Sequence, residues 1–363
     1  MYGADYGYKT SVSNLMVKHL KKKILDLKKY NILRDKTNIL DIGSNDGTFL
    51  NFFAKNKKKL NLYGIDPSAS AFLDNYSKNI NIIVDFFNKE TVKKNFKDKK
   101  IQFSLITSYA MFYDIEDPND FCKDISKLLT DDGIWSLEFS YFPLLLKNLT
   151  YDQICHEHCV YYSLDTFNKI ITKNNLKILD FNFNEINGGS IEIKCAKKNS
   201  KFKSHLKKIN SIIKQERKIS LKDFEKFNLR MENSKKNLQL FLNNQKKKNV
   251  IGYGASTKGN VILNYSKITN KHLSYICDAN KSKEGKYTPG SHIKIISKSK
   301  MRKLNPKFLV VLIWSFRSEV IKQEKKFLNN GGKLIFPLPV FHVVDKENYK
   351  KYLKEDFKIF SFS

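Results

Sequence analysis

Two apolar runs, each carrying an acidic residue near its end, constrain the fold of this chain more than any other feature. Residues 38–42 resemble a strand that breaks into a glycine-containing turn at 43–47, after which Thr48 begins a helix. A second apolar run ends at Asp66, 25 residues after Asp41. A strand–turn–helix–strand unit of this length is typical of a doubly wound α/β sheet with parallel strands.

The first turn and the two acids indicate a nucleoside site. Glycine lets a ligand approach the backbone closely, and a carboxylate at the end of the second strand can accept both hydroxyls of a ribose. The spacing Asp-x-Gly-x-x-x-Gly differs from the Gly-x-Gly-x-x-Gly of dinucleotide sites, and no P-loop lysine follows it. We therefore predict S-adenosylmethionine as the cofactor rather than NAD or ATP; a plain βα turn is the alternative. The expected cofactor-binding residues are Asp41, Gly43, Ser44, Asn45, Gly47, Asp66 (ribose) and Asp85 (adenine amine).

Length and composition indicate a folded protein with two domains. The chain has 363 residues, of which 41% are apolar, and no apolar run approaches the roughly 20 residues that span a bilayer. The start lacks the basic and apolar stretches of a signal peptide. The five cysteines are odd in number and include no C-x-x-C pair, which is typical of reduced thiols, so we expect a cytoplasmic protein. Cys155 and Cys159 flank two histidines and leave a metal site conceivable, but we expect none.

The formal charge of +30 raises the possibility of a nucleic-acid partner. However, the 66 basic residues comprise 61 lysines and only five arginines, whereas base-edge and bidentate phosphate recognition favour arginine. The lysines are also spread along the whole chain. We therefore expect a solvated lysine surface and no nucleic-acid partner.

The order of apolar runs predicts a domain at 1–198, a helical connector at 199–248 and a second α/β domain at 249–363. The lysine-rich stretch 201–248 has no glycine or proline and carries apolar residues at helical spacing, which predicts one or two helices. In the first domain, further strands are expected at 81–85, 103–107 and 134–139, and an antiparallel pair at 176–180 and 190–194 closes the sheet. In the second, they are expected at 249–253, 273–278, 308–313 and 333–336.

A second strand–turn–helix unit, residues 249–260, combines glycines and small residues with Lys258 at a helix start. Backbone amides and the helix dipole favour an anion there, although another tight βα turn is the alternative. The expected substrate-binding residues are Gly254, Ser256, Lys258, Asn260 and Asn187.

Ordered landmarks through nearly the whole chain resemble the sugar C-methyltransferases, S-adenosylmethionine enzymes that methylate a carbon of a nucleotide-bound keto-sugar. The resemblance implies a class I methyltransferase-like doubly wound sheet followed by a smaller Rossmann-like α/β domain on the nucleotide-sugar side. It also implies a nucleotide-diphosphate keto-sugar substrate and no membrane insertion. The landmarks are residues 6–9 (Tyr-Gly-Tyr-Lys), 13–16, 43–47, 111–118, 151–158, 187–190, 252–260, 288–292 and 331–339.

The His156-Glu157-His158 run acquires a chemical role through this resemblance. Methylation of carbon needs a carbanion equivalent, which proton abstraction next to a ketone provides, and histidine is a suitable base near neutral pH. The residues alone leave the two histidines equivalent, and ordinary hydrogen-bonded residues are the alternative. The family pattern favours His158 as the base, with Glu157 or Tyr151 orienting the sugar or the imidazole.

Two features depart from that family. Its members usually carry a zinc-binding segment with clustered cysteines ahead of the Tyr-Gly-Tyr landmark, and this sequence starts at the landmark, as a truncated gene, a mis-assigned start or a short form. The residue before the His-Glu-His run is often tyrosine, whereas here it is Cys155. Two other functions stay open: methylation of an oxygen or nitrogen, and non-catalytic binding of a nucleotide sugar. The sequence predicts no particular oligomeric state.

Overall fold

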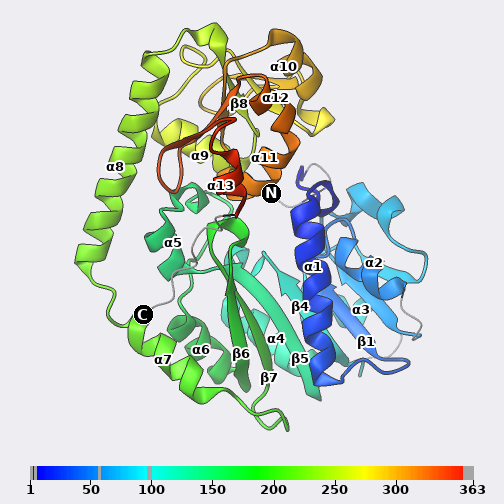
Figure 1. Cartoon of the computed structure of the whole chain (residues 1–363). Coiled ribbons are helices and arrows are strands. Elements are labelled where there is room, and N and C mark those ends of the chain that lie inside the picture. Colours follow the sequence, from blue (N-terminus) through cyan, green and yellow to red (C-terminus); the bar gives the residue numbers. More distant parts are fainter. Residues whose placement is uncertain (1–2, 4–5, 56–58, 96–99, 355–363) are drawn as a thin grey trace. The chain divides into compact units, whose positions relative to one another are not determined.

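The computed structural model describes residue 3 and residues 6–55, 59–95 and 100–354. The chain divides into two compact units that alternate along the sequence (Figure 1). Unit 1 comprises Met1–Tyr141, Cys159–Asn184 and Ser190–Arg217. Unit 2 comprises Phe142–His158, Glu185–Gly189 and Lys218–Ser363.

Within the described residues, unit 1 contains a seven-stranded sheet of order β3-β2-β1-β4-β5-β7-β6. Strands β1 to β5 are parallel, and β7 pairs antiparallel with both β5 and β6. This confirms the doubly wound sheet and its closing antiparallel pair. The strands are β1 (Asn38–Ile42), β2 (Asn61–Ile65), β3 (Ile80–Ile83), β4 (Phe103–Tyr109), β5 (Leu129–Ser140), β6 (Leu176–Asn184) and β7 (Ser190–Lys197).

Helices cover both faces of this sheet. On one face Leu20 and Leu27 of α1, with Phe49 and Phe53 of α2, belong to a core cluster that includes apolar residues of β1, β2 and β4. Trp135 of β5 packs among aromatic rings of α4 and α6, and its indole donates to Ser108 Oγ over 2.9 Å. The helices of unit 1 are α1 (Asn14–Leu27), α2 (Thr48–Ala54), α3 (Lys89–Asn95), α4 (Pro118–Leu128), α6 (Leu164–Lys173) and α7 (Leu206–Glu216).

Unit 2 contains a second sheet, six-stranded within the described residues, of order β10-β9-β8-β11-β12-β13. All its strands are parallel except β13, which confirms a second Rossmann-like unit. The strands are β8 (Val250–Tyr253), β9 (Tyr275–Asp278), β10 (Lys294–Ser297), β11 (Phe308–Val311), β12 (Lys333–Phe336) and β13 (His342–Val344). Its helices are α5 (Phe142–Asn148), α8 (Leu221–Asn243), α9 (Thr257–Tyr265), α10 (Lys298–Leu304), α11 (Arg317–Gln323), α12 (Lys325–Asn329) and α13 (Tyr349–Lys354).

The stretch 201–248 is helical, as its periodicity predicts, but its two helices belong to different units. Helix α7 packs with α6 and β6 of unit 1, whereas α8 packs with α5 of unit 2. The Arg230 guanidinium of α8 donates to the carbonyl oxygens of Leu146 and Lys147, which fixes α5 against α8. Contacts of this kind group residues 142–158 with unit 2, although the sequence prediction puts them within 1–198.

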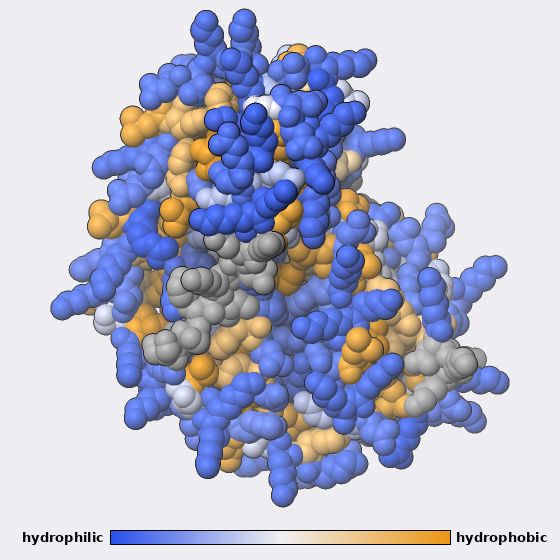
Figure 2. All heavy atoms as spheres, viewed as in Figure 1, coloured by the Kyte–Doolittle hydropathy of each residue, from blue (hydrophilic) through white to orange (hydrophobic). Residues whose placement is uncertain are grey.

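The face of the molecule in Figure 2 is mostly hydrophilic, in keeping with the lysine-rich composition. None of the described helices combines the length and the apolar character that crossing a bilayer requires.

Candidate functional site

The turn after β1 takes its shape from two glycines with positive φ. Gly43 has φ +72°, and its N–H donates to the Ile65 carbonyl over 2.9 Å, which joins the turn to the end of β2. Gly47 also has φ +72° and precedes α2, and a Cβ there would lie 2.6 Å from the Tyr76 ring. Glycine is therefore required at 47 for both conformation and space.

Asp66 is nearly buried at the end of β2 and ties this turn to the neighbouring strand. Its Oδ2 accepts from the Asn45 N–H over 2.8 Å, and its Oδ1 accepts from the Ser68 N–H and Oγ, each over 2.6 Å. Asp66 therefore lies beside the first turn, and its assignment to the ribose stays a prediction. A carboxylate has about four acceptor positions, so these bonds leave room for a hydroxyl.

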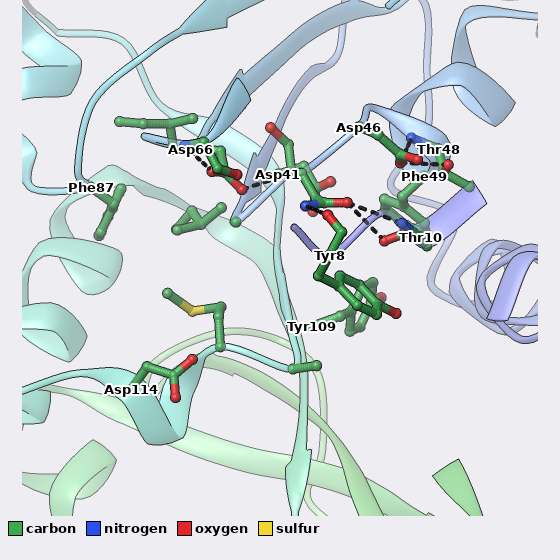
Figure 3. Close-up of a pocket in the computed structure, with 18 of the residues that line it drawn as sticks. Tyr8, Thr10, Asp41, Asp46, Thr48, Phe49, Asp66, Phe87, Tyr109 and Asp114 are labelled. Carbon is green, nitrogen blue, oxygen red and sulfur yellow. Dashed lines mark hydrogen bonds between the residues drawn. The ribbon is translucent and has the colours of Figure 1, made fainter. Parts of the chain in front are cut away.

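A cavity opens over the carboxyl ends of these strands (Figure 3). Of the expected cofactor residues, Asp41, Gly43, Ser44, Asn45 and Asp66 line it. Gly47 is not a lining residue. Asp85 lies outside the lining, is exposed, and accepts from the Phe86 N–H over 2.7 Å, whereas Phe86 and Phe87 do line the cavity. Its assignment to the adenine amine stays a prediction.

The N-terminal segment forms another wall of the cavity through Tyr6, Tyr8 and Thr10. Figure 3 labels Tyr8 and Thr10. Asn45 holds this segment, because its Oδ1 accepts from the Thr10 N–H over 3.1 Å and its Nδ2 donates to the Tyr8 carbonyl over 3.0 Å. Asp46 Oδ2 accepts from the Ser11 N–H over 2.9 Å. The Asn45 side chain therefore anchors the chain start rather than pointing solely to a ligand.

The cavity is acidic. Among its described lining residues there is no lysine or arginine, whereas five acidic residues line it: Asp41, Asp46, Asp66, Asp114 and Glu138. Burial raises the pKa of Asp41 to about 7, although Thr107 Oγ1 donates to it over 2.6 Å. A cavity with acids and no basic residue suits a cationic nucleoside such as S-adenosylmethionine and does not suit a polyphosphate.

In unit 2 the His-Glu-His segment lies against the start of α9. Glu157 Oε1 accepts from Thr257 Oγ1 over 3.1 Å. The next residue of α9, Lys258, donates from Nζ to Asn187 Oδ1 over 2.7 Å. Gln153 Nε2 donates to the Asn187 carbonyl over 2.5 Å. Segments near residues 155, 187 and 257 therefore meet in one cluster, and three of the predicted residues belong to it.

His158, the base that the family pattern favours, lies in an environment that lowers its pKa. Burial first, and then the positive charge of Lys258, lower the pKa of His158 to about 4. The imidazole is therefore neutral near pH 7 and able to accept a proton. Close by in sequence, buried Asp152 accepts from the Trp314 indole over 2.8 Å, and burial raises the pKa of Asp152 to about 6 against the effect of Lys258.

The neighbouring predicted residues differ in environment. Tyr151 is buried, its ring packs 5.1 Å from the Tyr265 ring, and burial raises its pKa to about 12. Burial also raises the pKa of the Cys155 thiol, so this residue is not a thiolate at neutral pH. His156 is exposed.

The turn before α9 repeats the geometry of the first turn. Gly254 has φ +93° and donates to the Cys277 carbonyl over 2.8 Å, as Gly43 does to the end of β2. Asp278 at the end of β9 accepts from the N–H groups of Ala255 over 2.7 Å and Asn280 over 2.8 Å, as Asp66 does in unit 1. Ser256 caps α9 by accepting from the Gly259 N–H.

Comparisons with known proteins agree with both parts of this description. Residues 16–180 match the family described as methyltransferase domain, and residues 185–339 match the family described as C-methyltransferase C-terminal domain. The chain is 27% identical over 349 residues to the C-methyltransferase NovU of Streptomyces niveus, covering 94% of this chain and 82% of that protein. The chain belongs to the S-adenosylmethionine-dependent C-methyltransferases.

Solved structures are also similar to part of this C-methyltransferase. The plantazolicin methyltransferase BpumL in complex with SAH is 16% identical, with a TM-score of 0.40, and the match covers 50% of this chain and 84% of that one. An S-adenosylmethionine-dependent methyltransferase from Clostridium acetobutylicum is 14% identical, with a TM-score of 0.36, and the match covers 49% and 89%.

Several residues of the C-methyltransferase's two sites carry no local signal in the sequence. Tyr8 and Thr10 reach the first turn across about 35 positions, and Asp152 pairs with Trp314 across 162. For Tyr8 and Thr10, the only sequence feature that points to a role is the nearby Tyr-Gly-Tyr landmark. Among the described residues, no group of three histidine, cysteine, aspartate or glutamate side chains could hold a metal ion.

Proposed function

We propose that this C-methyltransferase acts on a nucleotide-linked keto-deoxysugar, with proton abstraction next to the ketone followed by methyl transfer to carbon. The observation that carries the proposal is the cluster in unit 2. The positive charge of Lys258 helps to lower the pKa of His158, which is neutral near pH 7. Lys258 lies in the first turn of α9 and donates to Asn187 Oδ1. Such a cluster combines a base with a group that attracts an anion.

The nucleotide part of the substrate is supported by the turn before α9. Lys258 and the backbone N–H groups after Gly254 are suitable donors for a diphosphate. Asp278, which makes the same hydrogen bonds as Asp66, is a suitable acceptor for the ribose hydroxyls. Asn260 adds an Oδ1 without a hydrogen-bond partner among the described residues. Ser256 caps the helix and so keeps its first N–H groups in place.

In the proposed mechanism, His158 takes the proton from the carbon beside the ketone, and the electron pair of that C–H bond becomes the enolate of the sugar. Glu157, fixed by Thr257, orients the sugar or the imidazole. The cofactor, when bound, supplies an electrophilic methyl group on a positively charged sulfur. Transfer of that methyl group to the enolate carbon would form the new C–C bond as the sulfur–methyl bond breaks, and the neutral thioether would be released. Alignment of carbon and methyl contributes through proximity.

The proposal is tested by incubating the protein with a panel of nucleotide keto-sugars and methyl-labelled S-adenosylmethionine, followed by mass spectrometry. We expect one label per product, attached to a carbon next to the ketone. Equal turnover of sugars that lack a ketone would instead indicate methylation of oxygen or nitrogen. Cofactor binding with no turnover of any nucleotide sugar would contradict the proposed acceptor.

The base is tested separately by proton–deuterium exchange at the substrate carbon, with the demethylated cofactor present. A positioned base contributes about 10²–10⁴-fold, so His158→Ala should slow the exchange by at least that factor. His156→Ala is the matched control, because this exposed histidine should leave the rate within a few-fold of wild type. Exchange at the wild-type rate in His158→Ala would transfer the role to His156.

A further inference from the structure

Unit 1 buries an array of charged side chains between α1 and the sheet. Lys23 of α1 lies 2.6 Å from Glu138 Oε2 and 3.2 Å from Glu192 Oε2. Lys194 lies 2.7 Å from Glu192 Oε1. All four residues are at most 5% exposed. Removal of two carboxylates and two ammonium groups from water is costly, and apolar residues often serve stability equally well. Stability alone therefore does not explain the array.

Glu138 differs from the other three because it alone lines the cofactor cavity. It lies opposite Tyr109 in the β4–β5 register, and its carbonyl accepts from the Ala110 N–H over 2.8 Å. Tyr109 and Ala110 line the same cavity. Glu138 therefore lies on β5 beside the end of β4, where the first sheet borders the cavity.

The surroundings of Glu138 keep it ionised. Burial by itself raises its pKa, but Lys23 and His19 outweigh that effect and lower it to about 2. Oε2 accepts from Lys23 and, over 2.6 Å, from Asn184 Nδ2, and His19 Nε2 lies 3.0 Å from both oxygens. Among the described residues Oε1 is bonded only by His19, so an acceptor position remains for one more donor.

We propose that Glu138 binds the α-ammonium group of the cofactor's methionine part, and that His19 and Lys23 are positioning residues that aim it. Asp66 directly follows β2 and Glu138 lies on β5, which are three strand spacings apart in the order β2-β1-β4-β5, or about 14 Å at the usual spacing. Both residues line the same cavity, and a span of that size suits an extended ligand with a ribose at one end and an ammonium group at the other.

The proposal predicts which ligand group Glu138 recognises. Calorimetry compares S-adenosylhomocysteine with an analogue that lacks only the α-amino group, in the absence of any acceptor. Wild type should prefer the amino compound, and Glu138→Gln should reduce that preference about tenfold or more, because a charge-assisted bond is lost. Glu192→Gln is the matched control: it removes a carboxylate from the same array but not from the cavity, so the preference should stay at the wild-type value.

A second variant addresses the excess positive charge that Glu138→Gln leaves around Lys23, which keeps only Glu192 as an ion-pair partner among the described residues. The double variant Lys23→Met, Glu138→Gln restores charge balance and should show the same lost preference while folding as wild type does by circular dichroism. A wild-type preference in either Glu138 variant would overturn the proposal, and so would an equal loss in Glu192→Gln. Because no sugar is present, these outcomes are independent of the proposed acceptor.

Discussion

Asp41 has a proton affinity that makes the stability of the cofactor-free protein depend on pH. The pKa of Asp41 is about 7 in the folded protein, whereas the ordinary value of 3.8 applies to the unfolded chain. The folded state therefore binds the proton more tightly. The free energy of unfolding should therefore fall as pH rises from about 4 to about 7, by at most about 4 kcal/mol. Asp41→Asn should remove this fall, as measured by urea denaturation at several pH values.

Other titrating groups contribute equally to wild type and Asp41→Asn, so they cancel in the difference between the two free energies of unfolding. The lowered pKa of Glu138 stabilises the protein above about pH 4.5, and that stability is lost only as pH falls toward 2. Asp152 contributes in the same direction as Asp41, but equally in wild type and variant. Parallel stability curves for wild type and Asp41→Asn between pH 4 and 7 would contradict the assignment.

Asp66 is expected to bind the ribose. Asp66→Ala should weaken the binding of S-adenosylhomocysteine by about 1–3 kcal/mol, the usual loss for hydrogen bonds to a charged group. Calorimetry measures the affinity, and Asp74→Ala, an exposed acid in the same region of the chain, is the control. Equal affinities for both variants would reject the ribose role.

Lys258 lowers the pKa of His158, so replacing Lys258 with an uncharged residue should raise the pKa of His158. In the proposed mechanism only the neutral imidazole of His158 can accept the substrate proton, so Lys258→Met should move the acidic loss of kcat/KM to higher pH. An NMR titration of His158 gives the same pKa without substrate. Lys271→Met, at an exposed site in unit 2, should leave both measurements unchanged.

At the scale of elements, the segment before α1 depends on the first turn for its position. Asn45→Ala removes an acceptor for the Thr10 N–H and a donor to the Tyr8 carbonyl. At about 0.5–1.5 kcal/mol per lost bond, hydrogen exchange at Thr10 should speed up roughly two- to twelvefold. Asn51→Ala, whose side chain binds Asn75 and Ser77 instead, should leave Thr10 exchange unaltered. Unchanged exchange in Asn45→Ala would show that other contacts hold the segment.

Apolar runs predict the central strands well, because parallel strands buried on both faces are continuously apolar. This holds for β1, β11 and β12. The strands that the sequence does not predict are β10 and β13, the two edges of the second sheet. Each has only two apolar residues, whereas β11 has four and β12 has three. Edge strands are short and partly solvated, so their pattern is weak.

In the candidate sites, contacts within one strand–helix–strand unit can be predicted, whereas contacts between distant parts of the chain cannot. The position of Asp66 beside the first turn can be predicted, because strand–helix–strand units have a regular length. The pair Lys23–Glu138 is 115 positions apart and depends on how α1 crosses the sheet. No periodicity or motif contains that information.

For the whole molecule, the interleaved path of the chain has no counterpart in the linear sequence. Residues 142–158 and 185–189 group with unit 2 although they lie between strands of unit 1. Their grouping follows from contacts such as those of Arg230 with the end of α5, and of Lys258 with Asn187. Each compact unit is therefore assembled from three separated stretches of chain.

The two tryptophans of the chain fall one in each unit, Trp135 beside Ser108 and Trp314 beside Asp152. Intrinsic fluorescence can therefore report the two units separately, with Trp314→Phe leaving an emitter in unit 1 and Trp135→Phe leaving one in unit 2. Because the cavity that we assign to the cofactor is lined by residues of unit 1, S-adenosylhomocysteine at 100 times its Kd should stabilise the Trp135 transition by about 2.7 kcal/mol. A shift confined to the Trp314 emission would contradict that location. The chain thus carries its own pair of optical probes, with no label to attach.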